Sequence, residues 1–161
     1  MAPTEADPLR LVSVRRLVLE PWGGPPVASG WSNRYGNKAI LNSSGRPRFA
    51  ELAVLDLIRA EGWEGVWVDT FGSKYRTGMM DEPPVDLPEP HRAMLGSILA
   101  RDTTARPWDL LLWKPGAYLF VELKRTKKDH IQDTQRAFLR AALGSGVPPS
   151  AFMLVEWTLR A

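Results

Sequence analysis

The chain lacks cysteine altogether and has only two histidines, His91 and His130, among its 161 residues. Without thiols it has no disulfide, no thiolate metal site and no cysteine nucleophile. The two histidines lie far apart in sequence, so a His-rich zinc site is not expected. No serine lies in a nucleophile-elbow pattern, and no glycine run matches a Walker or dinucleotide motif. None of these classes of site is therefore predicted.

The chain also has no apolar run long enough to span a membrane. Residues 1–7 carry two acids and lack the basic start and apolar stretch of a signal peptide, so we expect a cytoplasmic protein without membrane contact. Hydrophobic residues make up 44% and charged residues 24%, the balance of a globular domain with a real core. A net charge of +3 permits nucleic-acid binding without requiring it.

The most informative feature is a pair of apolar runs separated by Pro115 and Gly116, which predicts an antiparallel hairpin. With these two residues at the centre of the turn, Asp109 lies directly opposite Glu122. The Cβ atoms of such a pair are roughly 4.5–5.5 Å apart, and like charges there are destabilising. The pair therefore needs a cation, a shared proton or water. Lys124 points to the same side as Glu122, whereas a slip of one residue would move Asp109 to the other face.

Two acids and a lysine on one sheet face are the arrangement that a divalent-metal phosphodiesterase requires. The alternative is that these charges simply meet solvent at strand ends. The second run, 118–124, is apolar on both faces until Glu122, which predicts a strand covered on both sides. Because charge is rarely buried without a partner, we favour the functional interpretation.

The N-terminal third of the chain predicts one strand, one loop and one helix. We expect the strand over 9–20, and an irregular loop over 21–47 that Ile40 and Leu41 anchor. We expect the helix over 47–61, begun by Pro47 and ended before Gly62.

Further elements follow in the order strand, loop, connector, helix, hairpin, helix, strand. Besides the hairpin, we expect a strand over 65–71, a polar basic loop over 72–77, an extended connector over 81–90, a short helix over 91–101, a helix over 130–143 and a strand over 151–158. Asp129 is the expected cap of the later helix, with Gln132 at its third position. The order predicts an α/β fold: a mixed sheet flanked by helices, with an extra N-terminal strand.

Two helical side chains are candidates for the same site. Glu51 shares a face with Val54, Leu55 and Ile58, so it points to the core or to a site at its edge. Alternatively, it only complements the helix dipole from the first turn, and the sequence leaves both interpretations open. Gln135 lies in the inward stripe of the later helix, whose other members are Ile131, Phe138, Leu139 and Ala142.

The combined pattern resembles the PD-(D/E)xK nuclease superfamily, whose common core is α-β-β-β-α-β. Within it, the chain is most similar to the VRR-NUC group of small, virus-type replication-repair nucleases. The residues that carry the likeness are Pro107-Trp108-Asp109, Glu122-Leu123-Lys124, Gln135 and Glu51. Trp108 is a departure, because it separates the proline from the acid of the literal Pro-Asp pair.

The resemblance covers residues 48–71 loosely and 105–158 more closely, and does not cover 1–47 or 72–104. It implies a single nuclease-like domain over 1–161, with a restriction-endonuclease-like core over 48–158 and an N-terminal extension over 1–47. It further implies a Mg²⁺- or Mn²⁺-dependent deoxyribonuclease that acts in replication, repair or recombination.

The resemblance also implies roles for individual residues. The metal ligands would be Asp109, Glu122, the carbonyl of Leu123 and Glu51. Lys124 would position the attacking water or stabilise charge on the phosphate. Gln135 would orient the lysine or the phosphate, or would be only a hydrogen-bonded helix residue.

The basic residues Arg125, Lys127 and Lys128 lie just before the later helix. Cations near a helix N-terminus oppose its dipole, so their placement suits a bound phosphate backbone. The alternative is an ordinary solvated charge run. Lys74 and Arg76 are candidates for a second backbone contact. The expected partner is DNA, branched or duplex, and a homodimer would suit a two-fold substrate.

Two other functions compete with the nuclease. The chain could be a catalytically inactive member of the same fold that binds nucleic acid or a protein. It could also be an interaction module in which the hairpin and the first helix only build a core.

Overall fold

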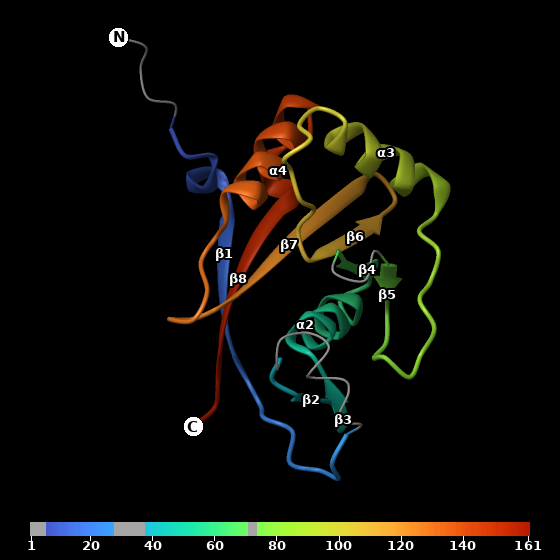
Figure 1. Ribbon diagram of the computed structural model, residues 1–161, viewed down its shortest axis with the longest axis vertical. Helices are drawn as coiled ribbons and strands as arrows, with labels where there is room; N and C mark the ends of the chain where they lie inside the picture. Colours follow the sequence, from blue (N-terminus) through green and yellow to red (C-terminus); the bar gives the residue numbers. More distant parts are fainter. Residues whose placement is uncertain (1–5, 28–37, 71–73) are drawn as a thin grey trace.

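The computed structural model describes residues 6–27, 38–70 and 74–161, which form a mixed α/β fold (Figure 1). Six strands make one sheet in the order β1-β8-β7-β6-β4-β5. Their bounds are β1 Ser13–Leu19, β4 Glu64–Asp69, β5 Lys74–Arg76, β6 Leu110–Lys114, β7 Ala117–Arg125 and β8 Phe152–Leu159. The pairs β1–β8 and β7–β8 are parallel, and the other three pairs are antiparallel.

Helices cover both faces of this sheet. Helix α2 (Ala50–Arg59) packs on one face, and α3 (Glu89–Leu99) and α4 (Asp133–Gly144) pack on the other (Figure 1). A small hairpin of β2 (Leu41–Ser43) and β3 (Arg46–Arg48) leads into α2, and the 3₁₀ turns η1 (Pro8–Leu11) and η2 (Pro149–Ala151) precede β1 and β8. None of the described helices is long and apolar enough to cross a membrane.

Strand β6 shows why the hairpin is so apolar. Leu110 and Leu112 belong to the core cluster that includes α2, whereas Leu111 belongs to the cluster that includes α3 and α4. All three side chains are fully buried. A strand with helices on both faces needs apolar residues at every position, because alternate side chains point to opposite faces.

The predicted register of the hairpin is confirmed. Lys114 pairs with Ala117, Trp113 with Tyr118 and Leu111 with Phe120. Gly116 has φ +76°, which the third position of a type II turn requires and which glycine adopts without strain. One pair beyond the end of the ladder, this register brings Asp109 beside Glu122.

The starts predicted for the helices over 47–61 and 130–143 were wrong. Helix α2 begins at Ala50, because Pro47 pairs with Asn42 inside the β2–β3 hairpin. Helix α4 begins at Asp133 with Gln132 as its N-cap, so the chain between β7 and α4 is longer than Asp129 as a cap implied. Gly62 does follow the end of α2, with φ +98°.

Other predicted bounds shift by a few residues. The N-terminal strand is shorter than 9–20, because the Asp7 carboxylate accepts from the Leu9 N–H and starts η1. Residues 28–37 of the predicted loop and 71–73 lie outside the described residues. The basic stretch predicted as a loop includes β5, which pairs with β4. Leu41 is fully buried, as its anchoring role requires.

Replacing Gly65 by Ala should destabilise the β4–β6 pairing. A Cβ at this position would lie 2.8 Å from the Leu111 carbonyl oxygen and 2.6 Å from Leu112 Cγ. We expect the free energy of unfolding to fall by about 1–3 kcal/mol, measured by urea denaturation. Gly96→Ala on α3 is the matched control, because its added Cβ meets nothing within 4 Å and a helical alanine should stabilise. Equal stability of the two variants would contradict this packing.

Candidate active site

Asp109 lies immediately before β6, and the short segment of Trp108 and Asp109 is held from two sides. On one side, the Val68 N–H of β4 donates to the Asp109 carbonyl at 2.7 Å. On the other, the fully buried indole of Trp108 donates to the Gln135 carbonyl at 2.9 Å, and its ring packs edge-on against Phe152. The residue that interrupts the Pro-Asp pair therefore anchors the acid to α4.

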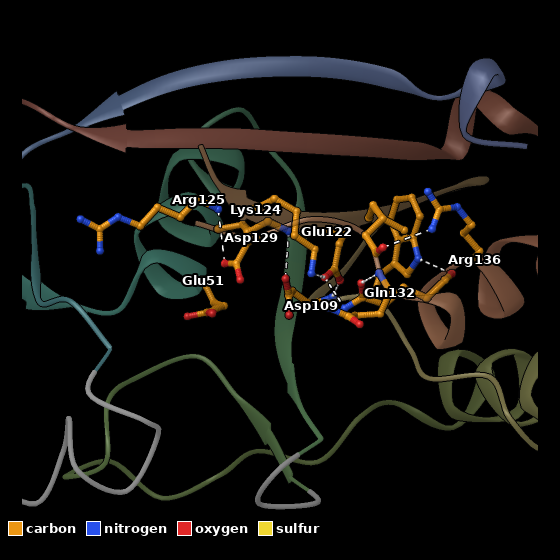
Figure 2. A network of polar contacts seen from close by, with 12 residues as sticks. Glu51, Asp109, Glu122, Lys124, Arg125, Asp129, Gln132 and Arg136 are labelled. Carbon is orange, nitrogen blue, oxygen red and sulfur yellow. Dashed lines mark hydrogen bonds and ion pairs between the residues drawn. The ribbon is translucent and has the colours of Figure 1, made fainter. Parts of the chain in front are cut away.

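Two hydrogen bonds across the hairpin join Asp109 to the neighbouring residues Glu122 and Leu123. The Asp109 N–H donates to Glu122 Oε1 at 3.0 Å, and the Leu123 N–H donates to Asp109 Oδ2 at 2.9 Å. Each carboxylate thus accepts from the main chain of the opposite segment. The two acids meet just past the end of the β6–β7 ladder, as the register predicted (Figure 2).

The second oxygen of Glu122 has two further partners. Lys124 Nζ lies 3.2 Å from Glu122 Oε2, and Gln135 Nε2 donates to the same oxygen at 2.7 Å. The Gln135 amide is itself oriented, because its Oε1 accepts from the Gln132 N–H at 2.8 Å. Gln132, at the start of α4, therefore orients the Gln135 amide, which in turn holds the Glu122 carboxylate.

Glu51 comes from the first turn of α2 and reaches the same end of the sheet. It is buried, with 7% of its surface exposed, which favours the site interpretation over a first-turn acid in solvent. Its Oε1 lies 2.5 Å from Lys38 Nζ, whereas its buried Oε2 has no hydrogen-bond partner among the described residues. In Figure 2 Glu51 lies beside Asp109, on the side away from Glu122, and its carboxylate turns away from Asp109.

The acids repel one another in a poorly solvated place. Burial, with a further contribution from the Glu51 charge, raises the pKa of Asp109 to about 6. Burial and the neighbouring Asp109 raise the pKa of Glu122 well above its usual value, against the opposing effect of Lys124. Ionised, the pair is a concentrated negative charge that favours a cation.

The chemistry of the donors, although not their present arrangement, suits a divalent ion of the Mg²⁺ or Mn²⁺ kind. Such ions prefer oxygen ligands, and Asp109, Glu122 and the unpartnered Glu51 oxygen supply them. Within the described ranges, however, no three His, Cys, Asp or Glu side chains are arranged as a ready-made metal cage. Glu51 is engaged by Lys38 instead of turning toward the other two acids.

The predicted nucleic-acid contacts fall into two groups. Lys127 and Lys128 are exposed in the turn after β7, and Lys74 is exposed on β5, opposite Asp69 at the end of the sheet that carries Asp109. Arg125 is half-buried, with its guanidinium over the Trp157 ring. Arg76 differs, because it is buried and donates to Asp69 at 3.1 Å. We therefore leave Arg76 out of the candidate nucleic-acid surface.

Sequence reasoning missed Lys38 and Asp129 as site residues. Both line a pocket of about 220 Å³, together with Glu51, Leu123, Arg125, Lys128 and three apolar neighbours. Lys38 lies 13 residues before Glu51 in a segment with no periodicity, so no local pattern connects the two. Asp129 was assigned to a helix cap, although its carboxylate faces the Arg125 N–H at 3.5 Å.

Comparison with protein-family models, with curated proteins and with solved structures finds no match to this chain. The functional proposal therefore depends on the geometry of the site and on the sequence pattern.

Replacing Asp109 by Asn should stabilise the metal-free protein at pH 8. The amide keeps the shape and the bond from Leu123 but removes a charge that burial disfavours, so we expect a gain of about 1–3 kcal/mol in urea unfolding. Asp69→Asn is the matched control, because it breaks a buried ion pair with Arg76 and should destabilise.

The stabilisation by Asp109→Asn should also depend on pH. A raised pKa means that the folded state binds the proton more tightly than the unfolded chain does. The penalty is thus absent below about pH 4 and complete above about pH 6. The difference between the wild type and Asp109→Asn should therefore grow as pH rises through this window. A difference that is constant from pH 4 to pH 8 would contradict the assignment.

Proposed function

We propose that this chain is a Mg²⁺- or Mn²⁺-dependent nuclease that hydrolyses phosphodiester bonds in DNA. The observation that carries the proposal is the contact of Asp109 and Glu122 across the hairpin, with Lys124 at 3.2 Å from Glu122. Two acids and a lysine at one end of a sheet supply ligands and a positive group for an anionic substrate.

The order of elements supports the same proposal. Omitting β5, α3 and the 3₁₀ turn η2, the chain from α2 onward runs α2, β4, β6, β7, α4, β8. This order matches the α-β-β-β-α-β order expected of a restriction-endonuclease-like core. Glu51 lies on the first helix and Gln135 on the second, as the resemblance to the PD-(D/E)xK superfamily predicts. A cytoplasmic location and a homodimer stay predictions.

The residues have distinct roles in this mechanism. Asp109, Glu122, the Leu123 carbonyl and Glu51 would hold the ion, which when bound polarises the phosphate and makes water easier to deprotonate. Lys124, held by Glu122, positions the attacking water or stabilises charge that builds on the phosphate oxygens. Gln135 keeps the Glu122 carboxylate in place, as its bond of 2.7 Å indicates.

A second candidate is a nucleic-acid-binding protein without catalysis. The observation in its favour is that no ready-made metal cage exists among the described residues, with Glu51 paired to Lys38 and Glu122 satisfied by Lys124 and Gln135. A gel shift without cleavage in Mg²⁺ and in Mn²⁺ would favour this function over the nuclease.

The nuclease proposal is tested by cleavage of labelled duplex, single-stranded, flap and four-way-junction DNA. We expect cleavage in Mg²⁺ or Mn²⁺ and none in EDTA. Alanine at Asp109, Glu122 or Lys124 should lower the rate by about 100-fold or more, with circular dichroism unchanged. Glu61→Ala, beyond the opposite end of α2 from Glu51, is the control and should cleave normally. Full activity in all three site variants would rule out this active site.

The basic turn after β7 provides a separate test of DNA contact. Lys127 has φ +65°, a conformation that strains most side chains, so Lys127→Gly should leave stability equal or raise it by up to about 1 kcal/mol. If Lys127 contacts a phosphate, the variant should bind DNA more weakly, with a salt dependence reduced by about one charge. Lys127→Asn, which also tolerates this backbone conformation, should behave alike. Unchanged affinity and salt slope in both variants would show that Lys127 is merely solvated.

A further inference from the structure

Lys38 forms an ion pair with Glu51. Its Nζ lies 2.5 Å from Glu51 Oε1, and the side chain is one-third exposed while that of Glu51 is 10% exposed. The contact joins the segment before β2 to the first turn of α2. Lys38 therefore brings a positive charge into the acidic end of the sheet from a part of the chain that the superfamily resemblance does not cover.

The charge of Lys38 acts on more than one acid. Burial lowers the pKa of Lys38, but the hydrogen bond and charge of Glu51 and the charges of Asp109 and Asp129 together outweigh it, so that the pKa is raised. Reciprocally, Lys38 and Lys124 both oppose the rise in the pKa of Asp109. Two lysines thus neutralise part of the acid cluster, Lys124 at Glu122 and Lys38 at Glu51.

Pairing with Lys38 leaves the Glu51 carboxylate only partly hydrogen-bonded. One carboxylate oxygen is bound to Lys38, and the other is buried without a hydrogen-bond partner among the described residues. A buried carboxylate oxygen normally has a partner, so Glu51 is only half satisfied. A divalent ion that drew both oxygens toward Asp109 would need Glu51 to leave Lys38.

We propose that Lys38 is a built-in competitor of the divalent ion, which holds Glu51 out of the ligand set and so lowers the metal affinity of the site. The inference rests on the proposed nuclease function and names the residue that regulates its metal site. Lys38 is a positioning residue, because it acts through Glu51. A purely structural ion pair would instead change stability without changing metal affinity.

The experiment is calorimetric titration of the full-length protein with Mn²⁺, without DNA. We expect Lys38→Met to bind Mn²⁺ about five- to twenty-fold more tightly than the wild type, the range of a partly buried ion pair. Lys38→Arg retains the charge and should stay within about two-fold. Lys128→Met is the matched control, because it removes an exposed positive charge from the rim of the same pocket. If Lys38→Met does not fold, Lys38→Gln supplies the same comparison.

A double-mutant cycle with Glu51→Gln tests the route of the effect. Lys38→Met should no longer tighten Mn²⁺ binding when residue 51 is Gln, since the competition acts on the carboxylate. Equal Mn²⁺ affinity in the wild type and in Lys38→Met would overturn the inference. A gain in Mn²⁺ affinity in Lys128→Met as large as that in Lys38→Met would overturn it too. Either result would leave the nuclease proposal intact. Absence of Mn²⁺ binding in every variant would overturn both.

Discussion

The site depends on one interaction, the exchange of main-chain hydrogen bonds between the two segments of the hairpin through their acidic side chains. The Asp109 N–H is bound by Glu122, and the Leu123 N–H is bound by Asp109. These bonds continue the β6–β7 ladder past its last paired residues with carboxylates in place of carbonyls. They fix the buried Glu122 and the partly buried Asp109 beside each other, at the cost of desolvating two like charges.

The rest of the site compensates for that cost. Lys124 and the Gln135 amide satisfy Glu122, and Lys38 satisfies one oxygen of Glu51. Two contacts anchor these groups: the buried Trp108 joins the Asp109 segment to α4, and the exposed Gln132 orients Gln135 at the start of that helix. The acidic cluster is thus held by packing on both faces of the sheet, although it is itself polar.

The hairpin was predictable because its signals are local. The Pro-Gly turn sets the register, and the register determines which acids meet. The starts of α2 and α4 were not predictable in this way. Pro47 is as compatible with a strand at an edge as with a first helical turn, and Gln132 is an unusual cap. The contact of Lys38 with Glu51 joins segments that no local pattern connects. The burial of Arg76 follows from the pairing of β5 with β4, where Arg76 meets Asp69. The alternation of residues 72–77 was too short to show β5.

The energetics of these two desolvated acids weigh against a purely structural hairpin. Leu110, Leu111 and Leu112 show that this sheet is filled with apolar side chains wherever packing alone matters. At the next position toward the N-terminus the chain places Asp109, whose pKa burial raises, opposite Glu122, whose pKa is raised as well. Apolar residues there would avoid the desolvation cost and the repulsion. Strained electrostatics of this kind concentrate at functional sites, where the charge serves a ligand and not the fold.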